Sequence, residues 1–255
     1  MTDGKTIPGK FVWFEHISSD AKQAQAFYAE LFGWHAQAFP EGGGYEMIVA
    51  GDEMIGGYGT SGADERAQWM SCVSVADVDA AVAASVAAGG KVVVPAADSA
   101  GIGRLARVAD PQGAELWVLN NTRGDPPDRK LAPVGTFFWN ELHTTAAAEA
   151  AAFYTKVFGY THAPMDMGPS GTYHVLESAG EGRGGISDDL TAGVAPHWLP
   201  YVHADDPDAT LERARKLGAS TPVDAMDIPG VGRFGVLKDP TGAILAVMKP
   251  MPRQG

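Results

Sequence analysis

The sequence predicts an α+β protein in which a βαβββ module occurs four times. Two observations lead to this prediction. The second half of the chain repeats the first, and within each half the pattern of strands and helices starts again midway. The 255 residues are enough for two ordinary domains, and an apolar fraction of 45% is typical of globular proteins with a buried core.

The long-range repeat is clearest where FVWFEHIS, which begins at residue 11, returns as FFWNELHT, which begins at residue 137. The Trp and the Glu recur 126 positions later, as Trp13 with Trp139 and Glu15 with Glu141. Further along, other pairs recur at offsets of 128 and 129, which small insertions explain. The histidine at position 16 does not recur, since Leu142 takes its place.

The repeat places a first domain at residues 1–122 and a second at residues 132–255. The segment between them, residues 120–134, reads NNTRGDPPDRKLAPV and is rich in proline and charge. This composition is typical of an exposed linker.

Each copy opens with a strand and a helix. In the first copy, residues 9–18 are rich in β-branched and aromatic residues, as strands are. Residues 20–33 follow with apolar side chains at helical spacing, which predicts one buried face. Ser19 or Asp20 is expected to cap this helix, and Gly33 to end it. The expected face consists of Ala24, Phe27, Tyr28, Leu31 and Phe32, repeated as Ala150, Phe153, Tyr154, Val157 and Phe158.

The remaining elements of the first copy follow the same logic. Three short strands are expected at residues 34–40, 44–51 and 53–60. The pattern then restarts with a strand at 68–76, a helix at 77–90, and strands at 91–95, 103–110 and 114–120.

Composition excludes several classes of partner. A formal net charge of −12 argues against binding the phosphate backbone of a nucleic acid or docking on an anionic membrane. No apolar run reaches the roughly 18–20 residues of a membrane span, and the N-terminus lacks the apolar core of a signal peptide. Cys72 is the sole cysteine, which excludes an internal disulfide framework. We therefore expect a cytoplasmic protein.

The arrangement resembles the glyoxalase/bleomycin resistance protein/dioxygenase superfamily, also called vicinal oxygen chelate (VOC), and within it the two-domain glyoxalase-like proteins. The likeness is carried by AFYAELFGW and AFYTKVFGY after the opening strands, and by the turns DPQGAELWV and DPTGAILAV near the end of each copy. The resemblance implies that paired modules curl into two open barrel-like domains, each around a cavity.

The family's chemistry, as the resemblance implies, depends on a divalent metal that polarises two adjacent substrate oxygens. Its ligands come from the first strand of each module and from the last strand of the copy. By register these positions fall on residues that are not donors for such a metal. They are Trp13, Met70 and Trp117 in the first copy, and Trp139, Leu199 and Ala246 in the second. The sequence therefore departs from the metalloenzyme pattern in both copies.

Strand alternation sorts the neighbouring residues. Glu15 and Glu141 share a face with their Trp, whereas His16 points to the opposite face and is expected to pack or lie at the surface. Each Glu is either a carboxylate that orients a ligand or a general base, or an internal hydrogen-bond partner.

In the second copy, His143 shares the face of Glu141, and Tyr201 and His203 share a face of another strand. Two interpretations stay open here. The two histidines are ordinary residues at a rim, or Glu141, His143 and His203 form a relocated metal site.

The other polar residues are expected to be structural. Arg104 and Arg233 suit tight turns with ion pairs, although either could anchor an anion. Cys72 suits a small core position. His174 and His197 are expected to face solvent or loops, and Glu115 is a weak substitute ligand on the face of Trp117.

Three tryptophans at the former ligand positions predict an aromatic wall suited to a flat organic molecule. The first hypothesis is a metal-free protein that binds a small apolar or aromatic metabolite or drug, without a cofactor. The alternative is a glyoxalase-type lyase or a dioxygenase with a relocated metal, and a third possibility is an interaction protein with a filled cavity.

The chain is expected to act as a monomer with paired domains or as a homodimer. The predicted ligand-binding residues are Trp13, Glu15, Met70, Trp117, Trp139, Glu141, His143, Tyr201 and His203.

Overall fold

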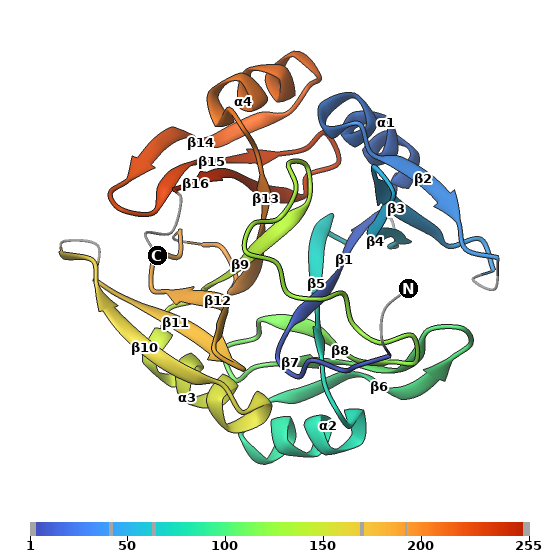
Figure 1. Cartoon of the computed structure of the whole chain (residues 1–255), viewed down its shortest axis with the longest axis vertical. Helices are drawn as coiled ribbons and strands as arrows, with labels where there is room; N and C mark the ends of the chain where they lie inside the picture. Colours follow the sequence, from blue (N-terminus) through green and yellow to red (C-terminus); the bar gives the residue numbers. More distant parts are fainter. Residues whose placement is uncertain (1–3, 41–42, 63–64, 169–170, 192, 252–255) are drawn as a thin grey trace. The chain divides into compact units, whose positions relative to one another are not determined.

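The computed structural model describes residues 4–40, 43–62, 65–168, 171–191 and 193–251, and confirms four βαβββ modules in chain order (Figure 1). The first copy comprises β1 (Phe11–Ser18), α1 (Ala21–Phe32), β2 (His35–Ala38), β3 (Glu46–Ala50), β4 (Glu53–Thr60), β5 (Gln68–Ser74), α2 (Val78–Ala87), β6 (Lys91–Ser99), β7 (Gly103–Ala109) and β8 (Glu115–Asn121). The second comprises β9 (Phe137–His143), α3 (Ala147–Phe158), β10 (Thr161–Asp166), β11 (Thr172–Ser178), β12 (Glu181–Ser187), β13 (His197–His203), α4 (Pro207–Lys216), β14 (Ser220–Ile228), β15 (Gly232–Lys238) and β16 (Ile244–Pro250).

Each copy contributes one mixed sheet of eight strands. The first has the order β2-β3-β4-β1-β5-β8-β7-β6, and the second has the order β10-β11-β12-β9-β13-β16-β15-β14. The opening strand of each module pairs in parallel with the last strand of the same module, as β1 does with β4 and β9 with β12. Neither sheet closes on itself, so both are open, as expected.

The helices begin at side-chain caps close to the expected positions. The carboxylates of Asp20, Asp77 and Asp206 each accept a hydrogen bond from a backbone N–H three residues later. Ala146, at the start of α3, has no such side chain. Asp188, from the segment after β12, accepts from the first N–H of α3 instead, at 2.7 Å.

One strand differs from its expected length. The sequence predicts 91–95, but β6 continues to Ser99 past Pro95. Proline has no N–H to donate to a ladder, so it is tolerated at sheet edges and irregular positions. β6 is an edge strand, and its register shifts on both sides of Val94, which accommodates Pro95.

The chain divides into two compact units, which are described separately. Unit 1 comprises Met1–Trp13, Met70–Asp128 and Trp139–Trp198, and unit 2 comprises Phe14–Trp69, Arg129–Phe138 and Leu199–Gly255. Helices α2 and α3 pack together in unit 1, and α1 and α4 pack together in unit 2. Each unit therefore combines most of one module from the first copy with most of one from the second.

Most side chains of the predicted helix faces are buried, whereas Phe32, Val157 and Phe158 are partly exposed. In unit 1, Phe153 and Tyr154 of α3 belong to one apolar core with Leu116 of β8 and Leu176 of β11. In unit 2, Phe27 and Tyr28 of α1 are likewise buried.

The segment between the copies is exposed along most of its length, as expected, but not at Gly124 and Asp125. The Asp125 carboxylate accepts from the backbone N–H of Ile7 at 2.6 Å and from the hydroxyl of Ser74 at 2.5 Å. This turn is therefore anchored to unit 1 by a buried carboxylate.

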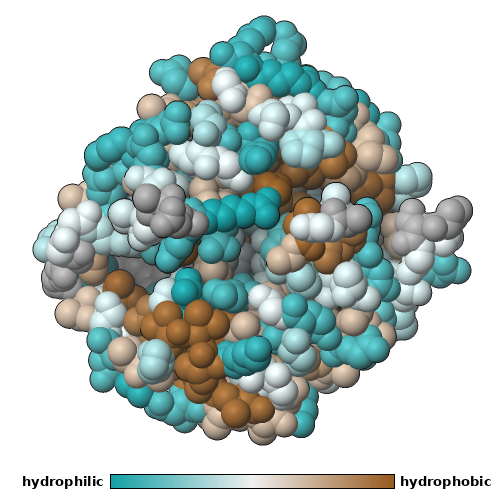
Figure 2. All heavy atoms as spheres, turned by 180° about the vertical axis from the view of Figure 1, so that it is seen from behind, coloured by the Kyte–Doolittle hydropathy of each residue, from teal (hydrophilic) through white to brown (hydrophobic). Residues whose placement is uncertain are grey.

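Hydrophilic side chains are common on the face drawn in Figure 2. On the face drawn in Figure 2, hydrophobic side chains form separate patches among hydrophilic ones. In the described residues, no helix is both long and apolar enough to cross a membrane.

Candidate functional site

Burial along β1 and β9 follows the alternation that the sequence predicts. In β1, the side chains of Phe14, His16 and Ser18 are buried and those between them are partly exposed. In β9, Asn140 and Leu142 are buried. Its partly exposed side chains include Trp139, Glu141 and His143, which we call the β9 face.

The β9 face is held by Tyr173 of β11. The Tyr173 hydroxyl donates to Oε2 of Glu141 at 2.9 Å, and Nε1 of Trp139 donates to the same hydroxyl oxygen at 2.9 Å. The ring of Tyr173 lies over Gly185 of β12, where a Cβ would collide with it. Gly184 and Gly185 repeat Gly56 and Gly57 of the first copy, and Gly185 thus makes room for the tyrosine that orients Glu141.

His143 approaches Glu141 from its other side. Nε2 of His143 lies 3.1 Å from Oε1 of Glu141, while Nδ1 lies 2.8 Å from the carbonyl oxygen of Asp189. A carbonyl oxygen only accepts, so Nδ1 carries a proton and donates it. Nε2 is therefore the ring nitrogen that gains or loses a proton, and it faces a carboxylate.

The electrostatic surroundings favour the charged form of His143. Burial alone would lower its pKa, but the Glu141 carboxylate and the Asp189 carbonyl outweigh burial and raise it above the usual range. The side chains of His143 and Glu141 are 16% and 14% exposed, so solvent reaches this pair. The ring of His197 stacks nearly parallel to that of His143, with centroids 5.5 Å apart.

The first copy retains the carboxylate without the histidine. Glu15 lies beside Gly59, where a Cβ would approach Oε1, and the Tyr45 ring covers Gly57 as Tyr173 covers Gly185. The counterpart of His143 is Ile17. The two copies therefore share the aromatic and acidic framework, and the Glu–His pair belongs to the second copy.

The other predicted site residues lie elsewhere on the sheets. Met70 is buried in β5, and Trp117 is next to Cys72 across the β5–β8 pair. The Trp117 ring is covered by the guanidinium of Arg107, 5.6 Å from its centroid, and Arg107 also pairs with Glu115 at 3.3 Å. Glu115 is thus an ion-pair partner in this structure.

Tyr201 and His203 belong to unit 2, whereas the residues of the β9 face belong to unit 1. Tyr201 is buried against the rings of Phe138 and Phe234. His203 donates from Nδ1 to the carbonyl oxygen of Ala132 at 2.7 Å and lines a surface pocket of about 640 Å³ with Arg213.

The donors present do not fit the family's metal. The helices begin after Asp20, Asp77, Ala146 and Asp206, the positions from which the register to Trp13, Met70, Trp139 and Leu199 is counted. Throughout the part of the chain that the structure describes, no three His, Cys, Asp or Glu side chains form a group able to hold a metal ion. Glu141 and His143 belong to unit 1 and His203 belongs to unit 2, so the hypothesis that the three converge on one ion stays a prediction.

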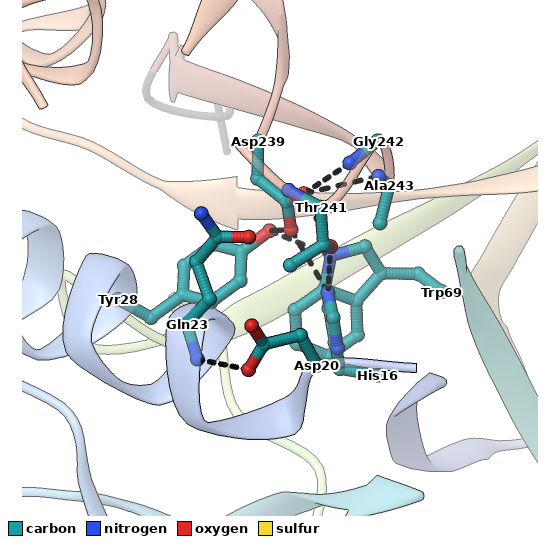
Figure 3. Close-up of polar contacts among 9 residues, drawn as sticks. All are labelled: His16, Asp20, Gln23, Tyr28, Trp69, Asp239, Thr241, Gly242 and Ala243. Carbon is teal, nitrogen blue, oxygen red and sulfur yellow. Dashed lines mark hydrogen bonds and ion pairs between the residues drawn. The ribbon is translucent and has the colours of Figure 1, made fainter. Parts of the chain in front are cut away.

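His16, which the alternation pointed away from the ligand face, lies in a buried polar cluster of unit 2 (Figure 3). Its Nε2 lies 2.8 Å from Oδ2 of Asp239, and both side chains are fully buried. Tyr28 of α1 donates to the same Oδ2 at 2.9 Å, and Trp69 donates to the Tyr28 hydroxyl at 2.9 Å. His16 is thus a buried packing residue, as the strand alternation allowed.

Asp239 belongs to the turn DPTG, and its Oδ1 accepts from the backbone N–H groups of Thr241, Gly242 and Ala243. Burial would raise the pKa of this carboxyl, but His16, Thr241 and Tyr28 together lower it. The cluster joins α1 of the first copy to a turn of the second.

Three further expectations have clear outcomes. Arg104 pairs with Asp79 and Asp98, and Arg233 pairs with Asp208 and Asp227, which confirms structural ion pairs. Cys72 is buried, as expected. The expectation for His174 was wrong: it is buried on β11, where burial and then His162 lower its pKa.

Sequence reasoning did not select Tyr173 or the Asp189 carbonyl for the site. A signal for the tyrosine exists, because Tyr45 and Tyr173 recur with the Gly-Gly pairs at one offset. No sequence signal identifies a backbone carbonyl as a partner.

Comparison with known proteins places this fold. The sequence-family model of the glyoxalase-like domain matches this chain twice, at residues 13–119 and 139–248. A Mycobacterium tuberculosis protein proposed to be a glyoxylase, CFP32, is 38% identical over 251 residues, covering 95% of each chain. The anthracycline biosynthesis protein DauV of Streptomyces sp. (strain C5) is 31% identical over 264 residues, covering 95% of this chain and 94% of its own.

Solved structures share the fold at low sequence identity. The Mn(II)-bound glyoxalase from Novosphingobium aromaticivorans aligns with a TM-score of 0.68 and 20% identity, covering 96% of this chain and 83% of its own. The 2,3-dioxygenase LapB from Pseudomonas sp. KL28 aligns with a TM-score of 0.65 and 12% identity, covering 99% and 96%.

Proposed function

The chain belongs to the glyoxalase-like family as a tandem member, and within that family we propose that it binds a small, flat aromatic molecule on the β9 face of its second copy. The observation that carries the proposal is the set of side chains on that face. Trp139 and Tyr173 supply ring surface, and Glu141 with His143 supplies a polar pair that solvent reaches. Ligand sites combine these two components, with few polar groups among aromatic ones.

Relatives support this class of ligand. DauV is named as a protein of anthracycline biosynthesis, and anthracyclines contain flat fused rings. The similarity covers nearly the whole of both chains, so the relevant domains correspond. A flat ring system also suits the partly exposed rings of Trp139 and Tyr173, since aromatic contacts are favourable at offset-stacked or edge-on geometry.

Tryptophan fluorescence tests the proposal directly. Titration with a panel of fused-ring compounds, including hydroxyanthraquinones, is expected to quench emission. Trp139→Ala is expected to weaken the binding by about tenfold or more, because it removes a stacking surface and a partner of Tyr173. Trp13→Ala, the matched change in the first copy, shows whether that copy holds a second molecule. Binding that is unchanged in both variants would contradict the proposal.

The competing function is a metal-dependent lyase or dioxygenase. Elemental mass spectrometry on protein reloaded with Zn, Ni, Mn and Fe(II) separates the two functions. We expect less than about 0.1 metal per chain, because the described residues lack a set of three or four suitable donors. About one metal per chain, lost in His143→Ala, would favour the enzyme instead.

A further inference from the structure

Resting on that proposed function, we propose that the bound aromatic molecule carries a ring hydroxyl, phenolic or enolic, and that Glu141 accepts its hydrogen bond while His143 acts as a positioning residue. The proposal concerns the chemistry of the ligand and the division of roles within the pair. It is carried by the contacts of Glu141, by the fixed orientation of His143 and by the difference between the two copies.

Glu141 is oriented from two sides. Tyr173 donates to Oε2, and Nε2 of His143 lies 3.1 Å from Oε1. An ionised carboxylate only accepts hydrogen bonds and offers roughly four lone-pair sites, which suits it to a donor on the ligand. Its side chain is 14% exposed, which leaves it within reach of a ligand lying on the β9 face.

His143 is arranged to support Glu141. Its Nδ1 is committed to the Asp189 carbonyl, and its Nε2 is buried without a hydrogen bond of good geometry among the described residues. The ring thus turns its one remaining nitrogen toward the carboxylate. The imidazole therefore sets the position and charge balance of Glu141, and Glu141 makes the contact with the ligand.

The charges define the class of ligand. When His143 is protonated, the pair carries one positive and one negative charge and is neutral as a unit. A ligand carboxylate would meet the negative charge of Glu141, and a ligand ammonium would meet the positive charge of His143. A neutral hydroxyl avoids both costs and donates to an ionised acceptor, which makes a stronger hydrogen bond than a neutral one.

The fold does not require this pair. The first copy forms the same strand, with Glu15 and Tyr45 in the matching positions, and has Ile17 where the second has His143. The first copy thus forms this strand without a histidine beside its glutamate.

The test compares 2-hydroxyanthraquinone with 2-methoxyanthraquinone on the wild-type protein by fluorescence quenching. The methyl ether keeps the rings and removes the donor. We expect the hydroxyl compound to bind about 10- to 100-fold more tightly, as a hydrogen bond to a charged group implies. This comparison needs no variant, so folding defects do not affect it.

Variants then assign the roles. Glu141→Gln is expected to reduce the preference for the hydroxyl compound to less than about threefold. The Tyr173 hydroxyl would still donate to the amide oxygen, so the NH₂ group, which cannot accept, would face the ligand. Glu212→Gln, the same change at an exposed carboxylate of α4, should keep the full preference. His143→Phe should lose most of the preference, and His143→Gln, which retains a donor toward Glu141, should restore part of it.

The outcomes separate the two proposals. If both compounds bind wild type within threefold of each other and Trp139→Ala weakens both, the hydroxyl inference is overturned and the proposed function stands. If neither compound binds, both fall. A full preference in Glu141→Gln, or equal values in His143→Phe and His143→Gln, overturns the assigned roles.

Discussion

Each copy has a histidine on its opening strand, but the two histidines occupy positions that differ by one residue, and this difference changes their roles. In β1 the order is Glu15 then His16, and the imidazole is buried against Asp239. In β9 the order is Glu141, Leu142, His143, and the imidazole lies beside Glu141 where solvent reaches it. Successive side chains of a strand point to opposite faces, so a shift of one residue exchanges core for surface.

The buried turns show the consequence for the core. Asp110 and Asp239 begin equivalent turns, and each accepts from a helix tyrosine that in turn accepts from a tryptophan. Only Asp239 has a histidine partner among these contacts. Burial raises the pKa of Asp110 despite its hydrogen bonds, whereas His16 and its neighbours reverse the effect of burial on Asp239 and lower its pKa. His16, Thr241 and Tyr28 together therefore favour the anion of Asp239, whereas burial disfavours the anion of Asp110.

The largest expected effect comes from His16→Leu, which gives the first copy the residue of the second. It leaves the buried Asp239 carboxylate without its imidazole partner, and we expect a loss of about 3–5 kcal/mol in the free energy of unfolding at neutral pH. Urea denaturation measures it. A loss of less than about 1 kcal/mol would show that Asp239 does not depend on His16.

The next largest effect is the loss of stability in Asp239→Asn, compared with that in Asp110→Asn. Each replaces one carboxylate oxygen by an NH₂ group facing a donor, and we expect losses of about 1–3 kcal/mol, the larger at Asp239. The asymmetry arises because Oδ2 of Asp239 has two side-chain partners, His16 and Tyr28. Equal losses at the two sites would contradict it.

The same two variants give opposite pH dependences. The pKa of Asp239 is lowered in the folded protein. Its carboxylate therefore contributes fully to folding stability above the pKa of about 3.9 in the unfolded chain, and this stability is lost as pH falls through the folded pKa. The pKa of Asp110 is raised in the folded protein. Its contribution to folding stability is therefore fully present below the unfolded pKa of about 3.9 and is lost as pH rises through the folded pKa. The advantage of wild type should therefore grow with pH against Asp239→Asn and shrink with pH against Asp110→Asn. Slopes of the same sign would refute the assignment.

The smallest expected effect is that of Ile17→His, which gives the first copy the histidine of the second. Ile17 is partly exposed, so we expect a change of less than about 1 kcal/mol in stability. NMR titration should show an additional imidazole with a pKa above about 6.5, as Glu15 would stabilise its charged form. A pKa at or below that value would indicate that Glu15 and Glu141 differ in their surroundings.

Much of the fold was predictable because its signals are local. The strand before each helix, the cap at Asp20 and the apolar face at Phe27 and Tyr28 follow from periodicity and capping within a few residues. The orientation of Glu141 and His143 toward one face also followed from alternation. Tyr173 and the Asp189 carbonyl did not, because alternation says nothing about which neighbouring strand or loop meets a side chain.

By itself, the sequence determined the four modules, the two open sheets and the face on which each β1 and β9 residue lies. Only the tertiary structure decided that each compact unit combines modules of both copies, that His16 meets Asp239 across 223 positions, and that Glu141 lies between Tyr173 and His143. The physical reason is range. Backbone periodicity acts over a few residues, whereas a buried charge is stabilised by whichever side chains the packing of distant elements brings to it.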